Sequence, residues 1–191
     1  MPSDTTLLAF DTSAAHCAAA LLCGDDIVEV RVEEHAKGQA ERLMPMLEEM
    51  LARHALTWSR LTRIGVGVGP GNFTGIRISV SAARGLALGL GIPAVGVSSL
   101  EAMHHIDPTA TAAVRAPRDM LYVQEHGQPP KLCHASEVKN PRFHADAEAL
   151  IRAIALRASM VELTSLDRPK PLYIKPADAA PSRDAAPVIL S

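Results

Sequence analysis

The sequence predicts an α/β protein that begins with an antiparallel meander and continues with helices that connect parallel strands. Strand-like segments separated by short polar turns fill residues 6–33. After them, short apolar segments alternate with long helical patterns, which is typical of crossover connections. Hydrophobic residues make up 48% of the 191 residues, enough to build a sizeable core.

Three short strands are expected first. Residues 6–13 and 16–23 are apolar runs bounded by polar turns, and residues 27–33 alternate apolar and charged side chains, as a half-exposed strand does. A helix over residues 39–54 follows. Pro45 is expected to kink this helix or to mark its true start, because proline lacks the N–H group that a helix interior needs.

A glycine-rich loop, residues 69–75 (Gly-Pro-Gly-Asn-Phe-Thr-Gly), separates an apolar strand at residues 64–68 from a helix at residues 76–90. Glycines permit a tight turn, and Asn72 or Thr74 is expected to cap the helix. Free N–H groups at such a turn hold an anion or fix a packing contact. The loop lacks the Gly-Lys-Ser/Thr ending of a Walker loop and the spacing of a dinucleotide-binding fingerprint.

A strand at residues 94–97 completes the order strand, strand, strand, helix, strand, helix, strand. This is the order of the ribonuclease-H-like fold, the building block of the actin-like ATPases (the ASKHA fold). We therefore expect an intact first lobe, the N-terminal ribonuclease-H-like lobe, over residues 1–101. A reduced second lobe is expected over residues 102–191, ending in an extended, proline-rich C-terminal tail.

The second lobe is expected to contain paired strands at residues 112–114 and 120–124 and a helix over residues 145–160. Residues 168–176 contain several prolines and are expected to be extended, and the last fifteen or so residues to be loosely ordered.

Composition excludes several classes of protein. The net charge is −2 with both signs interspersed, so no overall charge favours nucleic acid or an anionic membrane. Three cysteines without a Cys-x-x-Cys pair favour reduced thiols over disulfides or a zinc site. The longest uncharged run, residues 85–100, contains glycines and a proline and is too short to span a bilayer. Because the N-terminus also lacks the pattern of a signal peptide, we expect a cytoplasmic protein.

Four segments carry a resemblance to a known family: residues 8–13, 39–46, 69–79 and 171–176. They occur in the same order in the TsaB (YeaZ) family, which the chain resembles most densely from residue 7 to about residue 102. The resemblance implies a non-catalytic scaffold subunit in making N6-threonylcarbamoyladenosine (t6A) at position 37 of tRNAs. It also implies a heterodimer with the catalytic transferase TsaD, help in recruiting the ATPase TsaE, and only indirect contact with tRNA. No cofactor of its own is expected, whereas ATP or ADP and a metal ion are expected in the partner subunits.

A partner-binding face is expected on the two long helices. Apolar side chains surround well over half of the helix at residues 39–54, more than one sheet-facing stripe needs, and its methionines suit an adaptable surface. Small residues at spacing four on the helix at residues 76–90 would let another helix approach closely. The alternative is that both helices are simply core. The expected interface residues are Leu43, Met46, Leu47, Met50, Arg77, Ser81, Arg84 and Gly85.

A contact with an anion is a second candidate role, assigned to the residues near the glycine-rich loop. For Asp11, accepting backbone hydrogen bonds is favoured over catalysis, because Ala14 and Ala15 stand where sugar kinases have phosphate-loop glycines. The residues of this candidate site are Asp11, Thr12, Ser13, Gly69, Gly71, Thr74 and Gly75.

No catalytic residue or metal ligand is expected in this chain. Neighbouring His104 and His105 diverge on a helix, and neighbouring His16 and Cys17 point to opposite faces of a strand. A Gly-x-Ser-x-Gly motif is absent from the sequence, which disfavours a peptidase. Two alternatives stay open: a small-molecule kinase of the ASKHA fold, and a self-associating regulator whose apolar helices pair with a second copy.

Overall fold

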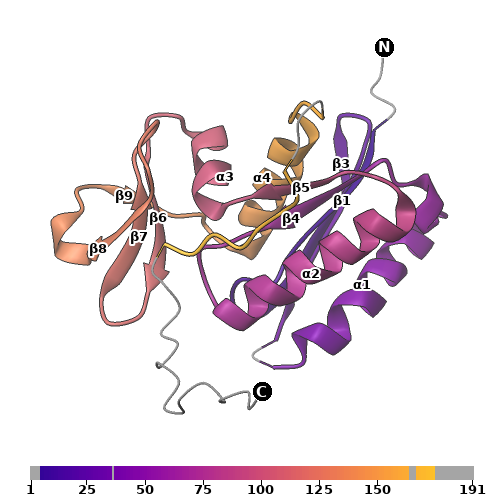
Figure 1. Cartoon of the computed structure of the whole chain (residues 1–191), viewed down its shortest axis with the longest axis horizontal. Coiled ribbons are helices and arrows are strands. Elements are labelled where there is room, and N and C mark those ends of the chain that lie inside the picture. Colours follow the sequence, from indigo (N-terminus) through magenta and orange to yellow (C-terminus); the bar gives the residue numbers. More distant parts are fainter. Residues whose placement is uncertain (1–4, 36, 164–166, 175–191) are drawn as a thin grey trace, which may run out of the picture.

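The computed structural model of this chain describes residues 5–35, 37–163 and 167–174. Within these residues, five strands form one sheet and four strands form a second, smaller sheet beside it, as Figure 1 shows. The larger sheet has the order β3-β2-β1-β4-β5. Its strands are β1 (Thr6–Asp11), β2 (His16–Cys23), β3 (Asp26–Glu34), β4 (Arg63–Gly67) and β5 (Ala94–Val97).

Two long helices lie side by side over one face of this sheet (Figure 1): α1 (Gln39–Arg53) and α2 (Phe73–Leu90). Leu8 and Phe10 of β1 face these helices, whereas Leu7 and Ala9 pack with α4 (Ala147–Ser159) on the opposite face. Alternation along a strand explains this division, because successive side chains point to opposite faces. The larger sheet is thus a central layer between two layers of helix.

The element order expected for the first part of the chain is confirmed. Strands β1, β2 and β3 pair antiparallel, and β1, β4 and β5 pair parallel through helical crossovers. Helix α1 begins at Gln39 and continues through Pro45, so the alternative that this proline marks the start is wrong. Asn72 is the cap of α2, since its side chain accepts a hydrogen bond from the Gly75 N–H at 2.9 Å.

The second sheet has the order β8-β7-β6-β9. Its strands are β6 (Thr111–Ala116), β7 (Met120–Gln124), β8 (Lys131–His134) and β9 (Pro141–Arg142). The antiparallel pairing of β6 with β7 was expected, whereas β8, β9 and the short helix α3 (Ser99–Ile106) were not. Short 3₁₀ turns occur at Trp58–Arg60 and Ala135–Glu137. Among the described residues, no helix combines the length and the apolar composition needed to cross a bilayer.

Helix α4 joins the two parts of the chain. It follows the second sheet in sequence, yet its apolar side packs on the larger sheet. Arg63, the buried first residue of β4, fastens the end of α4: its Nη1 donates to the carbonyls of Ala158 at 2.6 Å, Ser159 at 2.8 Å and Val161 at 3.0 Å. The division into lobes at residues 101 and 102 stays a prediction.

Residues 167–174 run without helix or strand across the edge of the larger sheet. The Leu172 N–H donates to the Val68 carbonyl at 2.8 Å, and Pro169 lies against Gly96. Leu172 joins the core under α1 and α2, while Ile174 packs with the cluster between α3 and the second sheet. This segment, which was expected to be extended, therefore ties the two sheets together. The remainder of the tail, residues 175–191, lies outside the described residues.

Candidate functional site

The glycine-rich loop lies directly against the turn between β1 and β2. The Asn72 N–H donates to the Ser13 carbonyl at 2.6 Å, and Thr12 Oγ1 donates to the Gly75 carbonyl at 2.7 Å. A Cβ atom on Gly75 would collide with the Thr12 carbonyl oxygen, and one on Gly71 with the Ser13 carbonyl oxygen. These glycines are therefore required by the close approach of two backbone segments.

Asp11 is a buried acceptor at the centre of this contact. Asp11 has no exposed surface. Its Oδ2 accepts hydrogen bonds from the Ser13 N–H at 3.0 Å and from the Ser13 Oγ at 2.8 Å. His16 Nε2 lies 2.9 Å from the same oxygen. Its Oδ1 faces Gly67 and has no partner among the described residues. The structural role expected for Asp11, accepting backbone hydrogen bonds, is confirmed.

The loop residues assigned to an anion contact come together in space, but several polar groups in and beside them are used within the protein. The N–H groups of Asn72 and Gly75 already donate to internal acceptors, and the buried carboxylate of Asp11 lies beside them. Gly69 has a positive φ of 93°, which its turn requires, and Thr74 is exposed. The anion contact itself stays a prediction.

Cys17 is poorly suited to be a nucleophile. Burial, with a smaller contribution from Glu33, raises the pKa of its thiol to about 11, so the thiolate is scarce at neutral pH. Its neighbour His16 is bound to Asp11, and the Cys17 thiol points to the Gln39 carbonyl. Among the described residues, no group of three or more His, Cys, Asp or Glu side chains is arranged to hold a metal ion.

The prediction of a partner-binding face on α1 is wrong in one respect: the four apolar side chains assigned to that face are not exposed. Leu43 is 1% exposed, and Met46, Leu47 and Met50 are fully buried in the core. Their spacing forms a single stripe, and the five-stranded sheet is wide enough to cover it. Met44, which made the apolar surface look wider in the sequence, is only half-buried and lies on the flank toward α2.

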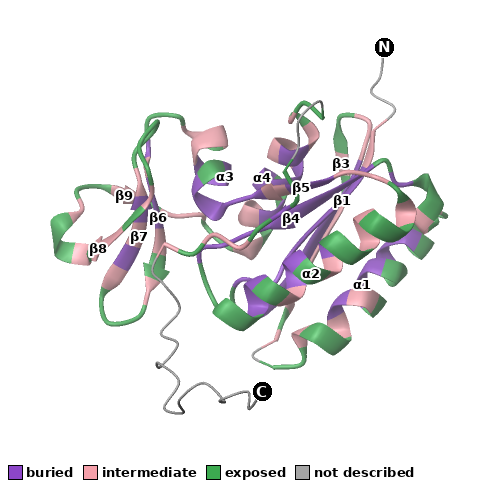
Figure 2. Ribbon diagram, in the orientation of Figure 1, coloured by how far each residue is buried: buried purple, intermediate pink, exposed green. Residues whose placement is uncertain are grey.

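Helix α2 does present an exposed side, visible as green segments along its length in Figure 2. We call this surface the α2 face, and it consists of Arg77, Ser81, Arg84, Gly85, Leu88 and Gly89. Leu88 is 83% exposed, although a leucine is costly to leave in water. A Cβ atom on Gly85 or Gly89 would meet nothing within 4 Å, so the α2 backbone is open to close approach here.

Two grooves flank the α2 face and meet at Gly85. One, of about 500 Å³, is lined almost wholly by apolar side chains, among them Met44, Trp58 and Leu86. The other, of about 560 Å³, lies between α2 and the segment around Arg168. A helix that crossed α2 at Gly85 would find a hollow for apolar side chains on either side.

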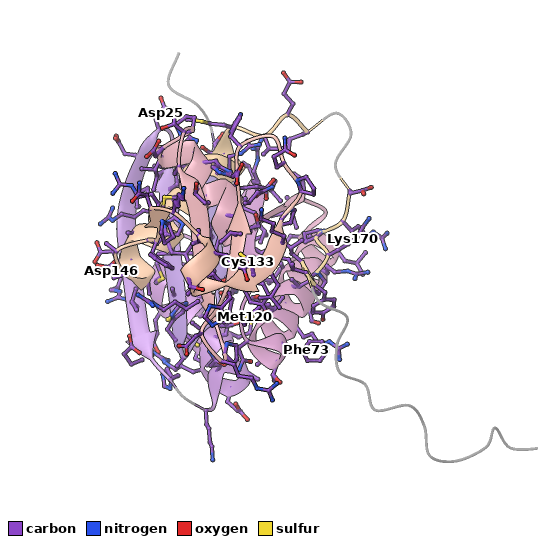
Figure 3. All side chains as sticks on the ribbon, turned by 90° about the vertical axis from the view of Figure 1, so that its left-hand side faces the viewer. Asp25, Phe73, Met120, Cys133, Asp146 and Lys170 are labelled. Atoms are coloured by element: carbon purple, nitrogen blue, oxygen red, sulfur yellow. The ribbon has the colours of Figure 1, made fainter. Side chains whose placement is uncertain are left out.

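Arg77 is held at the start of the α2 face by two aromatic rings. Its Cζ lies 4.1 Å from the centre of the Phe73 ring, and its Nε donates to the Tyr173 hydroxyl at 3.1 Å. Phe73 and Tyr173 stack with 5.2 Å between their centres. In Figure 3, Phe73 projects outward at the end of α2, on the side where Lys170 also lies. The tail segment thus orders one end of the α2 face.

A separate cleft of about 690 Å³ opens between the two sheets. Its walls come from the turn after β1, the loop at Pro70–Asn72, strands β6 and β7, and the start of α4. Phe143, Leu150 and Val114 make it mostly apolar, and Arg115 lies over the Phe143 ring at 4.7 Å. Sequence reasoning missed this cleft, because its residues are scattered along the chain.

Comparison with known proteins decides the family. The family model of TsaD, described as tRNA N6-adenosine threonylcarbamoyltransferase, matches residues 30–150 of the chain. The chain is similar to the tRNA threonylcarbamoyladenosine biosynthesis protein TsaB of Haemophilus influenzae, with 33% identity over 63% of this chain and 53% of that protein. The TsaB protein of Escherichia coli is 36% identical over 51% of this chain and 42% of that protein. The chain belongs to the TsaB/YeaZ family.

A solved TsaB/YeaZ-like structure supports the same assignment. A Pseudomonas aeruginosa protein, described as uncharacterized with similarity to the peptidase YEAZ, superposes with a TM-score of 0.61 at 29% identity. The superposition covers 74% of this chain and 72% of that protein. The resemblance noted in the sequence is therefore confirmed. This TsaB/YeaZ-family chain spans about half the length of the curated relatives it matches.

Proposed function

We propose that this protein is a non-catalytic subunit in the synthesis of t6A on tRNA, and that it docks through the α2 face onto a TsaD-type transferase and helps to recruit a TsaE-type ATPase. The names of its relatives support the pathway. The observation that carries the docking role is the open backbone at Gly85 and Gly89 beside an exposed Leu88. Exposed apolar surface of this kind is typical of interaction sites.

The two sheets also receive roles in this proposal. We assign the larger sheet and its helices to the first lobe of a ribonuclease-H-like, actin-like ATPase fold, and the smaller sheet to a reduced second lobe. In this assignment the glycine-rich loop fixes the start of α2, since it bonds to Thr12 and Ser13 and so orients the docking helix.

Co-purification with the TsaD-type transferase of the same organism tests the docking role. Leu88→Asp places a charge against the apolar surface of the partner and should weaken binding roughly tenfold or more. Ile106→Asp is the matched control, because Ile106 is 59% exposed on α3, away from α2 in Figure 1, and should leave binding unchanged. Unchanged binding by Leu88→Asp would remove α2 from the interface.

A small-molecule kinase of the same fold is the second candidate, favoured by the apolar cleft of about 690 Å³ between the sheets. Asp11 argues against it, since this carboxylate is fully buried and its Oδ2 is already occupied by internal donors. ATP hydrolysis by the isolated protein, measured against Asp11→Asn, separates the two functions. Turnover that depends on Asp11 would favour the kinase.

A further inference from the structure

We propose that the cleft of about 690 Å³ between the two sheets binds a small, uncharged molecule with an apolar body and a hydroxyl or N–H group. His16 accepts the hydrogen bond from that group. This inference goes beyond the proposed docking function and does not depend on it. It is carried by an unpaired ring nitrogen of His16, by the apolar walls of the cleft, and by the position of its charged side chains.

His16, the first residue of β2, is held by a buried carboxylate. Its Nε2 lies 2.9 Å from Asp11 Oδ2, and Asp11 has no exposed surface. A carboxylate oxygen only accepts hydrogen bonds, so Nε2 carries the hydrogen of the imidazole. The other nitrogen of the neutral ring, Nδ1, is then an acceptor. The contact with Asp11 therefore fixes both the orientation of the ring and the character of its second nitrogen.

This second nitrogen has no partner within the protein. None of the described residues forms a hydrogen bond with His16 Nδ1. The His16 side chain is 8% exposed and lines the cleft, so the little surface that it keeps opens into that space. A nearly buried acceptor without a partner costs free energy, which a donor on a bound molecule recovers.

A second imidazole in the cleft wall has the same arrangement. His144 Nε2 donates to the Ser99 carbonyl at 2.9 Å, and its Nδ1 is buried without a partner among the described residues. Burial lowers the pKa of His144, so this ring is neutral at neutral pH and its Nδ1 is also an acceptor. Because that atom lies beneath the surface, His16 is the acceptor that a ligand reaches first. Two acceptors in the walls indicate a ligand that donates.

The inner walls of the cleft are mostly apolar. Val114, Phe143 and Leu150 are half-buried there, and Tyr122 adds a second aromatic ring. Sites for small molecules typically enclose about 300–1,000 Å³ and combine apolar walls with a few polar groups. The cleft falls within this range, so the body of the ligand is expected to be an aromatic or a branched apolar group.

The charged side chains of the cleft favour an uncharged ligand. Glu34, Arg115 and Asp146 line it, and all three are exposed, so one positive and two negative charges lie at its rim. Charges of both signs there select neither an anion nor a cation. Among the side chains that the structure describes, no lysine lines the cleft, so the phosphates of a nucleotide lack that partner.

Two probes of similar shape locate the site: para-cresol, which has a hydroxyl group, and toluene, which lacks one. The chain contains three phenylalanines and two tyrosines, so few aromatic signals compete in an NMR spectrum. We expect contacts between the methyl group of either probe and the rings of Phe143 and Tyr122. Absence of these contacts at about 5 mM para-cresol would overturn the inference.

Variants of two histidines test the hydrogen bond. His16→Phe keeps an aromatic ring without its nitrogens, and should weaken the binding of para-cresol about tenfold while leaving that of toluene unchanged. His126→Phe, at an exposed histidine between β7 and β8 that does not line the cleft, is the matched control and should change neither. An equal effect of His16→Phe on both probes would overturn the role of His16.

Nitrogen NMR of the natural chain tests the same bond and needs no variant to fold. The spectrum should place the hydrogen of the His16 ring on Nε2, and the Nδ1 signal should shift with para-cresol and not with toluene. A His16 signal that para-cresol leaves unmoved would overturn the inference. Displacement of para-cresol by ATP with magnesium would also overturn it, because the cleft would then belong to a nucleotide, as the kinase candidate requires.

Discussion

The identity of Gly75 is decided by a residue 63 positions away in the sequence. Thr12 Oγ1 donates to the Gly75 carbonyl, and the Thr12 carbonyl occupies the space that a Gly75 side chain would need. A glycine in the first turn of a helix is locally unfavourable, because alanine is a better helix former. The contact between the loop and the β1–β2 turn outweighs this local preference.

Gly75→Ala should lower the free energy of unfolding by about 1–3 kcal/mol, since the backbone of Thr12 must move to admit the methyl group. Gly85→Ala is the matched control within the same helix. It meets nothing within 4 Å and should raise the free energy of unfolding by about 0.5–1 kcal/mol. Urea unfolding measures the free energy of unfolding of both variants. If the two variants lose the same free energy of unfolding, the collision at Gly75 is not the cause.

Arg63 shows how a buried charge can be used structurally. Burial lowers the pKa of its guanidinium, and three carbonyls at the end of α4 receive its hydrogen bonds. Arg63→Met should lower the free energy of unfolding by about 1–3 kcal/mol, because those carbonyls lose their donor. Arg60→Met, at an exposed arginine, should change it by less than about 0.5 kcal/mol. Thermal unfolding of the two variants compares them.

At the scale of elements, ion pairs connect β3 with α1. Hydrogen bonds from Arg42 lower the pKa of Glu33 to about 2. Hydrogen bonds from Arg42 and Arg31 together lower the pKa of Glu49 to about 2. A carboxylate whose pKa is lowered by folding adds stability above its ordinary pKa near 4.5. That stability is lost as the pH falls from about 4.5 toward 2.

Arg42→Met should therefore destabilise the protein more at pH 6 than at pH 3, because at pH 3 part of the contribution is already lost in the natural chain. Urea unfolding at the two pH values measures this difference. Arg60→Met serves as the control, since Arg60 forms no ion pair among the described residues. If Arg42→Met lowers the free energy of unfolding equally at both pH values, the titration of these glutamates is not the cause.

Much of the element order could be predicted from the sequence, because hydrophobic period and turn residues are local signals. Strands β2, β5 and β7 were predicted with the bounds that the structure has. The short helix α3 was missed, although its capping box, Ser98 with Glu101, is a readable local signal.

What covers the stripe on α1 could not be predicted. The stripe formed by Leu43, Met46, Leu47 and Met50 is visible in the sequence, but the width of the sheet beneath it is a property of five strands from distant segments. The exposure expected for the α2 part of the predicted interface agrees with the structure, and its use as an interface stays a prediction. Its spacing of Ser81, Gly85 and Gly89 is local, and these residues are exposed.

At the scale of the whole molecule, the larger sheet depends on a helix that is far away in the sequence. The face that contains Leu7, Ala9 and Leu22 is covered by Ile151 and Ile154 of α4. We expect a fragment of residues 5–107 to expose this face and to aggregate, because a large bare apolar surface favours association.

Adding a peptide of residues 146–163 should restore a soluble, cooperatively unfolding species, as measured by light scattering and circular dichroism. The same peptide with Ile154→Asp is the control and should fail, since Ile154 is fully buried in the native packing. A fragment that stays monomeric without the peptide would show that the first part of the chain is self-sufficient.

The late position of α4 has a consequence for synthesis in the cell. During translation, all five strands of the larger sheet leave the ribosome before α4 has been made, so one apolar face of that sheet stays uncovered in the nascent chain. During that interval, a ribosome-associated chaperone can bind the uncovered apolar face. The hydrogen bonds from Arg63 to the end of α4 can form only after the residues up to Val161 have left the ribosome.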